Sequence, residues 1–426
     1  MCRGMKDSGV QWISIIPESW EVKNIKSLLI ERKEINNPIK TEFILSLTKE
    51  RGVIPYSEKG DVGNKSKEDY TGYKLAYPKD IVLNSMNIII GSVGISNYFG
   101  AVSPVYYMLY PRKEGDYVEY FNYVFQTKEF QNNLKGYGNG IMEHRMRIQM
   151  NKLNTVLLPY PPVKQQNKIV NYLDKKVSQI DDIISKQKSL IEKYKAYKQS
   201  LITETVTKGL NKNVPMKDSG IEWIGEIPNH WNVEKMKYLI DFNPNYSENL
   251  NENVNVSFVP MECIGNGYMR YKEVQLKDVK GKYTYFSDKD IIMAKVTPCF
   301  ENGNIAIAND LINRVGFGSS ELYVFRCKKV DNKFMFYYLR NNIFKEGCIS
   351  TMTGTGGLKR VSASFIENYY IGIPEIDEQR EIAEFLDKKC KAIDSAISKK
   401  EKLIEKLESY KKSLIYECVT GKREVN

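Results

Sequence analysis

The sequence contains few of the residues that build metal centres and disulfide frameworks. Among 426 residues there are two histidines and seven cysteines, and no two cysteines form a CxxC pair. Neither His144 nor His230 stands in a cluster with the spacing of metal ligands. The pattern therefore predicts no metal site, and it fits the reducing cytoplasm better than an oxidising compartment.

Long apolar runs are also absent. No run approaches the roughly 18 apolar residues that a membrane helix needs. The opening "MCRGMKDSGV" lacks the apolar core of a signal peptide. We therefore expect a cytoplasmic protein with no membrane partner.

The motifs of several enzyme classes are missing as well. No GxxxxGKS/T phosphate loop occurs. The nearest approaches to the Asn/Asp-Pro-Pro-Tyr/Phe turn of an amino-methyltransferase are "NPNY" at 243–246 and "YPPV" at 160–163, and neither matches. The carboxylates of "DKD" at 288–290 are typical of a turn that enters a strand. No catalytic residue is predicted, and an enzyme with unrecognised motifs is the weakest of the alternatives.

What the sequence does have is a moderate excess of positive charge. The net charge is +11, which suggests an anionic partner. No segment is a polybasic tail, so any contact with nucleic acid must come from shaped surfaces. With 42% hydrophobic residues, a chain of this length can bury the cores of about two to four domains.

The opening of the chain is repeated in its middle. Residues 5–20 read "MKDSGVQWISIIPESW" and residues 216–231 read "MKDSGIEWIGEIPNHW", a likeness too close for chance. The tryptophans match in pairs, Trp12 with Trp223 and Trp20 with Trp231. We expect both pairs to plug an apolar edge at the entrance to a domain, as large aromatic side chains usually do.

A second repeat follows each variable stretch, at residues 165–207 and 378–420. In both copies apolar residues recur at alternating steps of four and three, the period of a coiled-coil seam. Prolines precede each start and a glycine follows each end, where helix punctuation belongs. Each repeat predicts one helix of about 60 Å at 1.5 Å per residue. The seam positions are Leu173, Val177, Ile180, Ile184, Ile191, Tyr194 and Leu201 in the first copy, and Leu386, Cys390, Ile393, Ile397, Ile404, Leu407 and Leu414 in the second.

These two helices need a partner for their apolar stripes. An amphipathic helix cannot bury its stripe alone, and the nearest complementary stripe is the other copy. We therefore expect the helices to pack on each other as a coiled coil. Their separation in the chain allows either a parallel or an antiparallel arrangement.

The variable stretches read as mixed α/β segments with many short strands. Runs such as "KDIVLNSM" and "KDIIMAKV" are bounded by Gly, Asn, Asp and Pro, as strands are. Each copy continues with an aromatic helix, "YFNYVFQTKEF" or "FMFYYLRNNIF". A glycine-rich loop follows, "GYGNGIMEHRMRI" or "MTGTGGLKRVS", which places Arg147 and Arg360 at matching positions.

The matched loops are the candidate DNA-contacting sites. A loop that brings backbone close to DNA, followed by an arginine that reaches a phosphate or a guanine, needs these residue types. A structural turn is an equally good interpretation of any single residue, and a nucleotide site would need a strand-loop-helix fingerprint that is missing. Recurrence in both copies favours DNA contact. The candidates are Asn84, Asn139, Arg145 and Arg147 in the first copy, and Lys295, Thr355, Lys359 and Arg360 in the second.

The ordered set of motifs resembles the DNA-specificity (S) subunits of Type I restriction-modification systems. "MKDSGxxWIxxIPxxW", a variable segment and "QxxIxxxLDKK" leading into a heptad helix occur twice and span essentially the whole chain. The resemblance implies two target-recognition domains, each reading half of a split DNA site. It also implies an antiparallel coiled coil that spaces them and docks two methyltransferase (M) subunits. The chain itself would be non-catalytic and without a cofactor, since S-adenosylmethionine would bind to the methyltransferase.

The expected architecture follows from the resemblance. The fold class is α+β, with mixed α/β target-recognition domains at 1–157 and 211–372 and helical spacers at 158–210 and 373–426, related by a pseudo-two-fold repeat. Low identity between the variable segments implies an asymmetric target. The implied partners are double-stranded DNA, two M subunits and, optionally, restriction or translocase (R) subunits. The alternative from another class is a standalone coiled-coil protein that bridges DNA without a methyltransferase.

Overall fold

The computed structural model describes residues 3–49, 51–60, 69–138, 147–355 and 357–425. It separates into two compact units, the first made of residues 1–187 with 401–426 and the second of residues 188–400. Each unit therefore holds one variable segment together with one half of each long helix.

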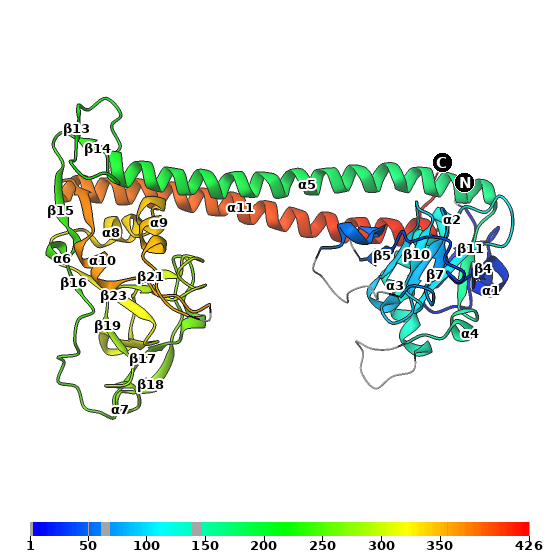
Figure 1. Ribbon diagram of the computed structural model, residues 1–426, viewed down its shortest axis with the longest axis horizontal. Coiled ribbons are helices and arrows are strands. Elements are labelled where there is room, and N and C mark those ends of the chain that lie inside the picture. Colours follow the sequence, from blue (N-terminus) through cyan, green and yellow to red (C-terminus); the bar gives the residue numbers. More distant parts are fainter. Residues whose placement is uncertain (1–2, 50, 61–68, 139–146, 356, 426) are drawn as a thin grey trace. The chain divides into compact units, whose positions relative to one another are not determined.

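The first unit places short strands and helices ahead of a long helix (Figure 1). Its strands are β1 (Met5–Asp7), β2 (Ile15–Pro17), β3 (Glu21–Asn24), β4 (Leu29–Arg32), β5 (Leu45–Thr48), β6 (Gly52–Pro55), β7 (Lys74–Ala76), β8 (Ile81–Asn84), β9 (Val93–Ile95), β10 (Gly100–Val102), β11 (Tyr106–Pro111) and β12 (Leu157–Tyr160). Its helices are α1 (Ile25–Leu28), α2 (Val118–Gln126), α3 (Lys128–Asn133), α4 (Met150–Leu153) and the first part of α5 (Val163–Lys208), with short 3-10 turns η1 (Tyr56–Glu58), η2 (Ile88–Ile90) and η3 (Leu134–Tyr137).

The second unit largely repeats this order of elements. Its strands are β13 (Met216–Asp218), β14 (Glu226–Pro228), β15 (Asn232–Lys235), β16 (Ile240–Phe242), β17 (Asn255–Val259), β18 (Lys272–Gln275), β19 (Thr284–Ser287), β20 (Ile291–Ala294), β21 (Ile305–Ile307), β22 (Val315–Gly318), β23 (Leu322–Cys327) and β24 (Tyr370–Ile373). Its helices are α6 (Met236–Leu239), α7 (Leu276–Val279), α8 (Asn332–Tyr338), α9 (Asn342–Ser350), α10 (Ala363–Asn368) and the first part of α11 (Ile376–Val419), with 3-10 turns η4 (Met261–Cys263) and η5 (Ile312–Arg314).

The same four-stranded antiparallel sheet forms in each unit. The strand order is β4-β11-β8-β9 in the first unit and β16-β23-β20-β21 in the second. The register also matches, because Asn84 faces Tyr106 in the first sheet and Ala294 faces Leu322 in the second. The inner strands β8 and β20 are almost entirely buried, which is why their sequences read as continuous apolar runs.

A second sheet is complete in one unit and interrupted in the other. In the second unit the order is β18-β17-β22-β19, and β17 runs parallel to β22. In the first unit β5 pairs with β6 and β7 with β10, and a single parallel bridge between Ile44 and Ala101 stands in place of the parallel ladder. The variable segments thus share one topology despite their low identity.

The long helices begin and end where their punctuation predicts. Helix α5 spans Val163–Lys208 and α11 spans Ile376–Val419. Gly209 and Gly421 follow with φ of +77° and +71°. A left-handed residue of this kind terminates a helix, and glycine adopts it without steric cost.

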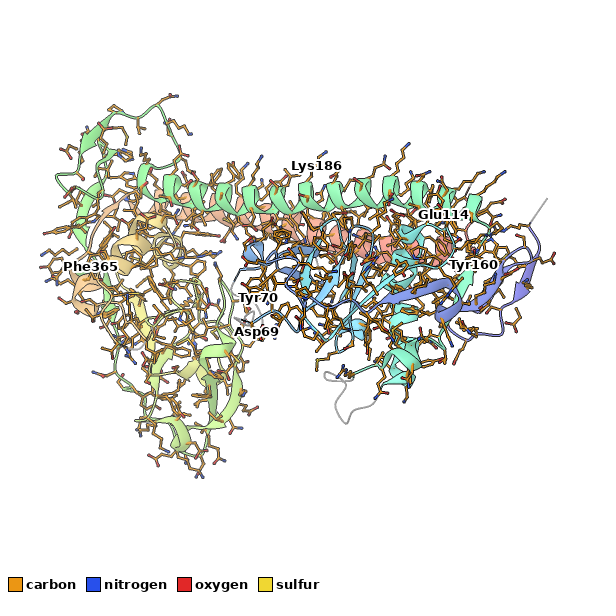
Figure 2. All side chains as sticks on the ribbon, turned by 45° about the vertical axis from the view of Figure 1, so that its right-hand side comes forward. Asp69, Tyr70, Glu114, Tyr160, Lys186 and Phe365 are labelled. Atoms are coloured by element: carbon orange, nitrogen blue, oxygen red, sulfur yellow. The ribbon has the colours of Figure 1, made fainter. Side chains whose placement is uncertain are left out.

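In each unit one half of α5 packs antiparallel against one half of α11 (Figure 1). Every predicted seam position is buried or half-buried, whereas Lys186 on the outer face of α5 is exposed (Figure 2). In the second unit Lys198 Nζ lies 2.6 Å from the Asp394 carboxylate, and in the first Lys411 Nζ lies 2.6 Å from Asp181. The two ion pairs are the same pair repeated, so the orientation that the sequence left open is antiparallel.

The duplicated openings form the same hairpin twice but differ at one tryptophan. Strand β1 pairs with β2, and β13 pairs with β14 in the same register. Trp20 and Trp231 are 1% and 0% exposed, and Trp12 is 7% exposed, as expected. Trp223 is 43% exposed, so the prediction that both pairs plug an apolar edge is wrong for Trp223.

The exposure of Trp223 has a local cause in the residue beneath it. In the first unit the Ile25 amide donates to the carbonyl of buried Val156, and in the second the Met236 amide donates to the carbonyl of Tyr369, both at 2.9 Å. A bulky tyrosine therefore stands where the first unit has a valine. The Trp223 ring lies on the outside of Tyr369, with 5.5 Å between ring centroids.

Candidate nucleic-acid interface

In the first unit, Arg147 lies beside the end of strand β8. The amide of the next residue, Ile148, donates to the Ser85 carbonyl at 3.0 Å, and the Ile148 carbonyl accepts from the Tyr107 hydroxyl at 3.2 Å. Ile148 is fully buried, whereas Arg147 is exposed. The buried neighbour fixes the backbone at the sheet, and the arginine stays accessible to a ligand.

In the second unit, Arg360 occupies the corresponding place. The Val361 amide donates to the Lys295 carbonyl at 2.9 Å, and the Val361 carbonyl accepts from the Tyr323 hydroxyl at 2.8 Å. Val361 is 2% exposed and Arg360 is exposed. The two arginines that match in the sequence therefore hold matching positions in the two sheets.

The glycine-rich loop before Arg360 is held as a narrow hairpin. The Arg360 amide donates to the Thr353 carbonyl at 2.8 Å, and the Thr353 amide donates back at 3.1 Å. Gly354 has φ of +147°, and a Cβ at this position would lie 2.2 Å from the Leu358 carbonyl oxygen. This glycine is thus required by the loop geometry itself, whatever the loop binds.

The guanidinium of Arg360 has a carboxylate partner. Its Nη2 lies 2.6 Å and its Nε 2.9 Å from the carboxylate oxygens of Glu321, which precedes strand β23. Both side chains are partly exposed, at 47% for Arg360 and 29% for Glu321. The hydrogen bonds from Arg360 hold the pKa of the Glu321 carboxyl below its usual range.

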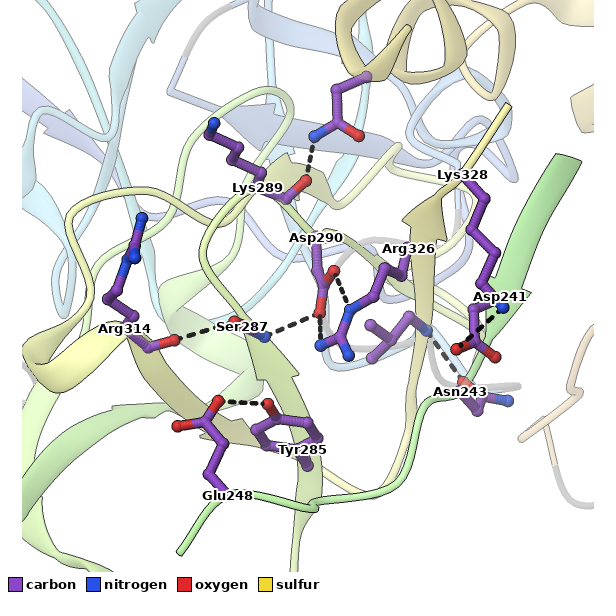
Figure 3. Close-up of polar contacts among 12 residues, drawn as sticks. Asp241, Asn243, Glu248, Tyr285, Ser287, Lys289, Asp290, Arg314, Arg326 and Lys328 are labelled. Atoms are coloured by element: carbon purple, nitrogen blue, oxygen red, sulfur yellow. Dashed lines mark hydrogen bonds and ion pairs between the residues drawn. The ribbon is translucent and has the colours of Figure 1, made fainter. Parts of the chain in front are cut away.

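A buried carboxylate supports the turn into the inner strand of each central sheet. Asp290 is 2% exposed and accepts from Arg326 at 2.7 and 2.9 Å and from the Ser287 amide at 2.8 Å (Figure 3). Asp80 is 1% exposed and accepts from Arg32 at 2.8 and 3.1 Å. The strand-entry turn predicted at "DKD" is present. The ion pair was not predicted, because its arginine comes from β4 in the first unit and β23 in the second.

A cleft of about 850 Å³ opens in the first unit where strand β8 ends. Apolar side chains line it together with polar, aromatic and basic ones and the acidic Glu58, and the polar and basic groups are of the kinds that contact DNA backbone and base edges. Its lining includes Ser46, Thr48, Lys49, Arg51, Tyr56, Lys59, Asn84, Asn87, Ser92, Ser103, Val105 and Tyr106. The cleft adjoins the strand end that anchors the Arg147 segment.

The other predicted DNA-contacting residues lie around these two sites. Asn84 is half-buried on the cleft, and its side-chain carbonyl accepts from the Met86 amide at 3.0 Å. The Lys295 ammonium lies 5.3 Å from the centre of the Tyr323 ring. Thr355 and Lys359 are exposed in the hairpin before Arg360. Asn139 and Arg145 lie outside the described residues. A DNA contact by any of the eight stays a prediction.

The junction between each variable segment and its long helix depends on a buried glutamine. Gln166 is 0% exposed, accepts from the Tyr117 amide at 3.0 Å and donates to a proline carbonyl at 3.1 Å. Gln379 is 2% exposed and does the same, accepting from the Asp331 amide at 2.7 Å and donating at 2.8 Å. A buried amide with both ends satisfied fixes the entry of the helix. The repeated "QxxI" motif is the sequence feature that marks these glutamines, although no role was predicted for them.

The aspartate of each "LDKK" motif ties the aromatic helix to the long helix. The Tyr123 hydroxyl donates to Asp174 at 2.6 Å, and the Tyr337 hydroxyl donates to Asp387 at 2.8 Å. Burial and these hydrogen bonds raise the pKa of both tyrosines. The shared motifs therefore build the docking of each variable segment onto its long helix.

Within the described ranges, no helix has both the length and the apolar character to cross a membrane. In the same part of the chain, no group of three or more His, Cys, Asp or Glu side chains could hold a metal ion.

Comparison with known proteins gives a match to a protein family and matches to individual relatives. The family described as "Type I restriction modification DNA specificity domain" matches residues 17–193 and 228–408. The chain is 28% identical, over 97% of its own length and 96% of the other, to a putative Type I restriction enzyme MjaX specificity subunit of Methanocaldococcus jannaschii. It is 36% and 35% identical to the EcoEI and EcoAI specificity subunits of Escherichia coli. Those matches cover 42% and 37% of this chain, and the chain spans only 31% and 27% of the two relatives.

Two solved structures share the fold at low sequence identity. One, described as "Structural basis underlying complex assembly and conformational transition of the type I R-M system", has a TM-score of 0.74 at 12% identity, covering 96% of this chain and 99% of that one. The other, the HsdS subunit from Thermoanaerobacter tengcongensis, has a TM-score of 0.58 at 13% identity, covering 96% and 98%. The paired α/β segments and long helices are thus an architecture that solved proteins also adopt.

Proposed function

Because the chain belongs to the Type I restriction modification DNA specificity family, we propose that it reads a bipartite, asymmetric DNA site as the specificity subunit of a restriction-modification complex. Each unit supplies one target-recognition domain for one half-site. The chain binds double-stranded DNA and performs no catalysis itself. S-adenosylmethionine is bound by the partner methyltransferase and not by this chain.

The observation that carries the proposal is the matched placement of Arg147 and Arg360. Both are exposed, both follow a glycine-rich stretch, and both precede a buried residue hydrogen-bonded to the end of an inner strand. A fixed backbone with an exposed guanidinium suits bidentate recognition of guanine O6 and N7, or of a phosphate. Because the surrounding loops differ between the units, the two arginines serve different sequences.

The helix pair supports the docking of two copies of one partner. The ion pairs Lys198–Asp394 and Lys411–Asp181 are the same interaction repeated in the two units. A surface that recurs in this way presents equivalent sites to identical subunits. Two methyltransferase subunits fit this requirement, and restriction or translocase subunits are optional further partners.

Co-expression with the cognate methyltransferase, followed by mapping of methylated adenines, tests the proposal. We expect one split motif with two different halves and a gap of fixed length. Cells that express the methyltransferase without this chain are the matched control and should show no such motif. Methylation by the purified chain alone would make it an enzyme. DNA bridging without any methylated motif would support the standalone coiled-coil alternative.

A further inference from the structure

The two units differ in charge at the residue before strand β11 in the first unit and before strand β23 in the second. The amide of Lys295 donates to the carbonyl of Glu321 at 3.0 Å, and the amide of Ser85 donates to the carbonyl of Val105 at 3.4 Å. Strand registers agree with this equivalence, since the next residues, Leu322 and Tyr106, face Ala294 and Asn84. The second unit therefore has a carboxylate where the first unit has an apolar valine.

The carboxylate at this position is directed at Arg360 by its surroundings. The Glu321 amide donates to the Ser319 hydroxyl at 3.2 Å, which holds the turn before strand β23. Arg360 is fixed by its two backbone hydrogen bonds to Thr353. Two parallel N–H···O bonds then join the guanidinium and the carboxylate. This fork geometry is the one that arginine also uses toward phosphate and guanine.

Resting on the proposed function, we infer that Glu321 is a specificity-determining residue for the second half-site. It occupies the fork of Arg360 and keeps that charge from the phosphates of non-cognate DNA. The Glu321 carboxylate repels a phosphate that approaches Arg360, whereas the neutral edge of a correctly placed guanine offers the same bidentate geometry without that repulsion. Val105 gives the first unit no such restraint, and among the described residues no carboxylate forms an ion pair with Arg147.

The electrostatics of non-specific binding support this assignment. Each phosphate neutralised by a protein cation contributes about −0.9 to the slope of log K against log salt concentration. An arginine already paired with a carboxylate contributes little to that slope. An exposed ion pair is also weak, so a better partner can replace it. Glu321 thus reduces affinity for random DNA more than affinity for the correct site.

The test measures binding of a non-cognate duplex as a function of salt. The full chain, co-purified with its methyltransferase, is compared with Glu321→Gln and with Glu321→Val, the residue of the first unit. Both variants should bind the non-cognate duplex more tightly, and the salt slope should steepen by about 0.9, the contribution of one phosphate contact. In an Arg360→Ala background neither substitution should change the slope.

Three outcomes would overturn the inference. The first is an unchanged slope in both Glu321 variants of a wild-type complex that binds DNA. The second is an equal change in the Arg360→Ala background, which would show a general charge effect. The third is an equal change for Glu262→Gln, since Glu262 is exposed and forms no ion pair with the described residues. A wild-type complex that binds no duplex at all would instead contradict the proposed function.

Discussion

The two units share a common structural frame, but they differ in the side chains at several equivalent positions. The hairpin that opens each unit, the central sheet and the glutamine at the helix entry recur at nearly constant spacing in the chain. Some equivalent positions hold different residues. Glu321 of the second unit takes the place of Val105 in the first, and Tyr369 takes the place of Val156. The difference shows that residues shared by the two copies hold the docking onto the helices. The residues that differ include Glu321, which pairs with Arg360, and Tyr369, which packs against Trp223.

One feature of the frame is maintained by unlike residues. Both units bury an aspartate at the turn into the inner strand, but its arginine is Arg32 from β4 in one unit and Arg326 from β23 in the other. The requirement is a charge partner at one point in space, because a buried, unpaired carboxylate is costly. A position-by-position alignment of the two copies would therefore miss a contact that both units possess.

The largest expected difference between the units is in the loss of stability when a tryptophan of the duplicated opening is removed. Trp12→Ala removes a buried indole that packs edge-on against Phe130 at 5.6 Å, and we expect it to lower the free energy of unfolding by about 3–5 kcal/mol. Trp223→Ala removes a ring that is 43% exposed and should lower it by less than about 1 kcal/mol. Urea unfolding followed by circular dichroism compares them. Equal losses would mean that the two openings are packed alike after all.

The buried aspartates should show equal effects where the sequences differ. Asp80→Asn and Asp290→Asn each leave an arginine without its charged partner, and we expect a loss of about 3 kcal/mol in each case. Asp241→Asn is the control, because Asp241 is 43% exposed and lies 3.5 Å from Lys328. It should cost less than about 1 kcal/mol. A loss of stability in only one of the two variants would contradict the claim that this ion pair has the same role in both units.

Each matched arginine should affect the recognition of only one half-site. Arg147→Ala should weaken reading of one half and Arg360→Ala of the other, each by about 1–3 kcal/mol if the contact is a bidentate base pair. Mapping of methylated sites and binding to duplexes altered in one half give the measurement. Helix content should be unchanged in both variants. Unchanged DNA affinity in folded variants would remove these residues from the interface.

Much of the frame could be predicted from the sequence. The heptads and their flanking prolines and glycines predicted both long helices to within a few residues, because a seam repeats over many turns. The apolar runs predicted the inner strands. The orientation of the helices could not be predicted, since a linker of this length permits both, and the order of the strands depends on pairings between distant residues.

Much less of the candidate site could be predicted. The offset between the two copies located Arg147 and Arg360, but not the Glu321 carboxylate, which is 39 residues from Arg360 in the chain. It also gave no sign that Trp223 would be displaced by Tyr369. Such contacts depend on which side chains converge at a sheet edge, and a single sequence carries no periodic signal for that.

The smallest expected effect concerns the distance between the half-sites. Insertion of four residues within 186–200 lengthens α5 by about 6 Å and turns its downstream face by about 40°. Slippage in the seam absorbs part of the lengthening, so we expect a gap longer by about one base pair, two at most, at 3.4 Å each. Both half-site sequences should be unchanged. An active variant that keeps the original gap would show that the helices do not set it.

The central claim is that two units of the same architecture each recognise one half-site. The most direct test of it is a chain that ends after Leu210. It keeps one opening, one variable segment and α5, whose buried Ile202 and Val206 correspond to Ile415 and Val419 at the end of α11. With both partners of the repeated ion pair, Asp181 and Lys198, on a single helix, two copies should pair as a homodimer. Co-expressed with the methyltransferase, this fragment should methylate a symmetric site made of the first half-site and its inverted repeat. A folded fragment that stays monomeric and directs no methylation would contradict the account.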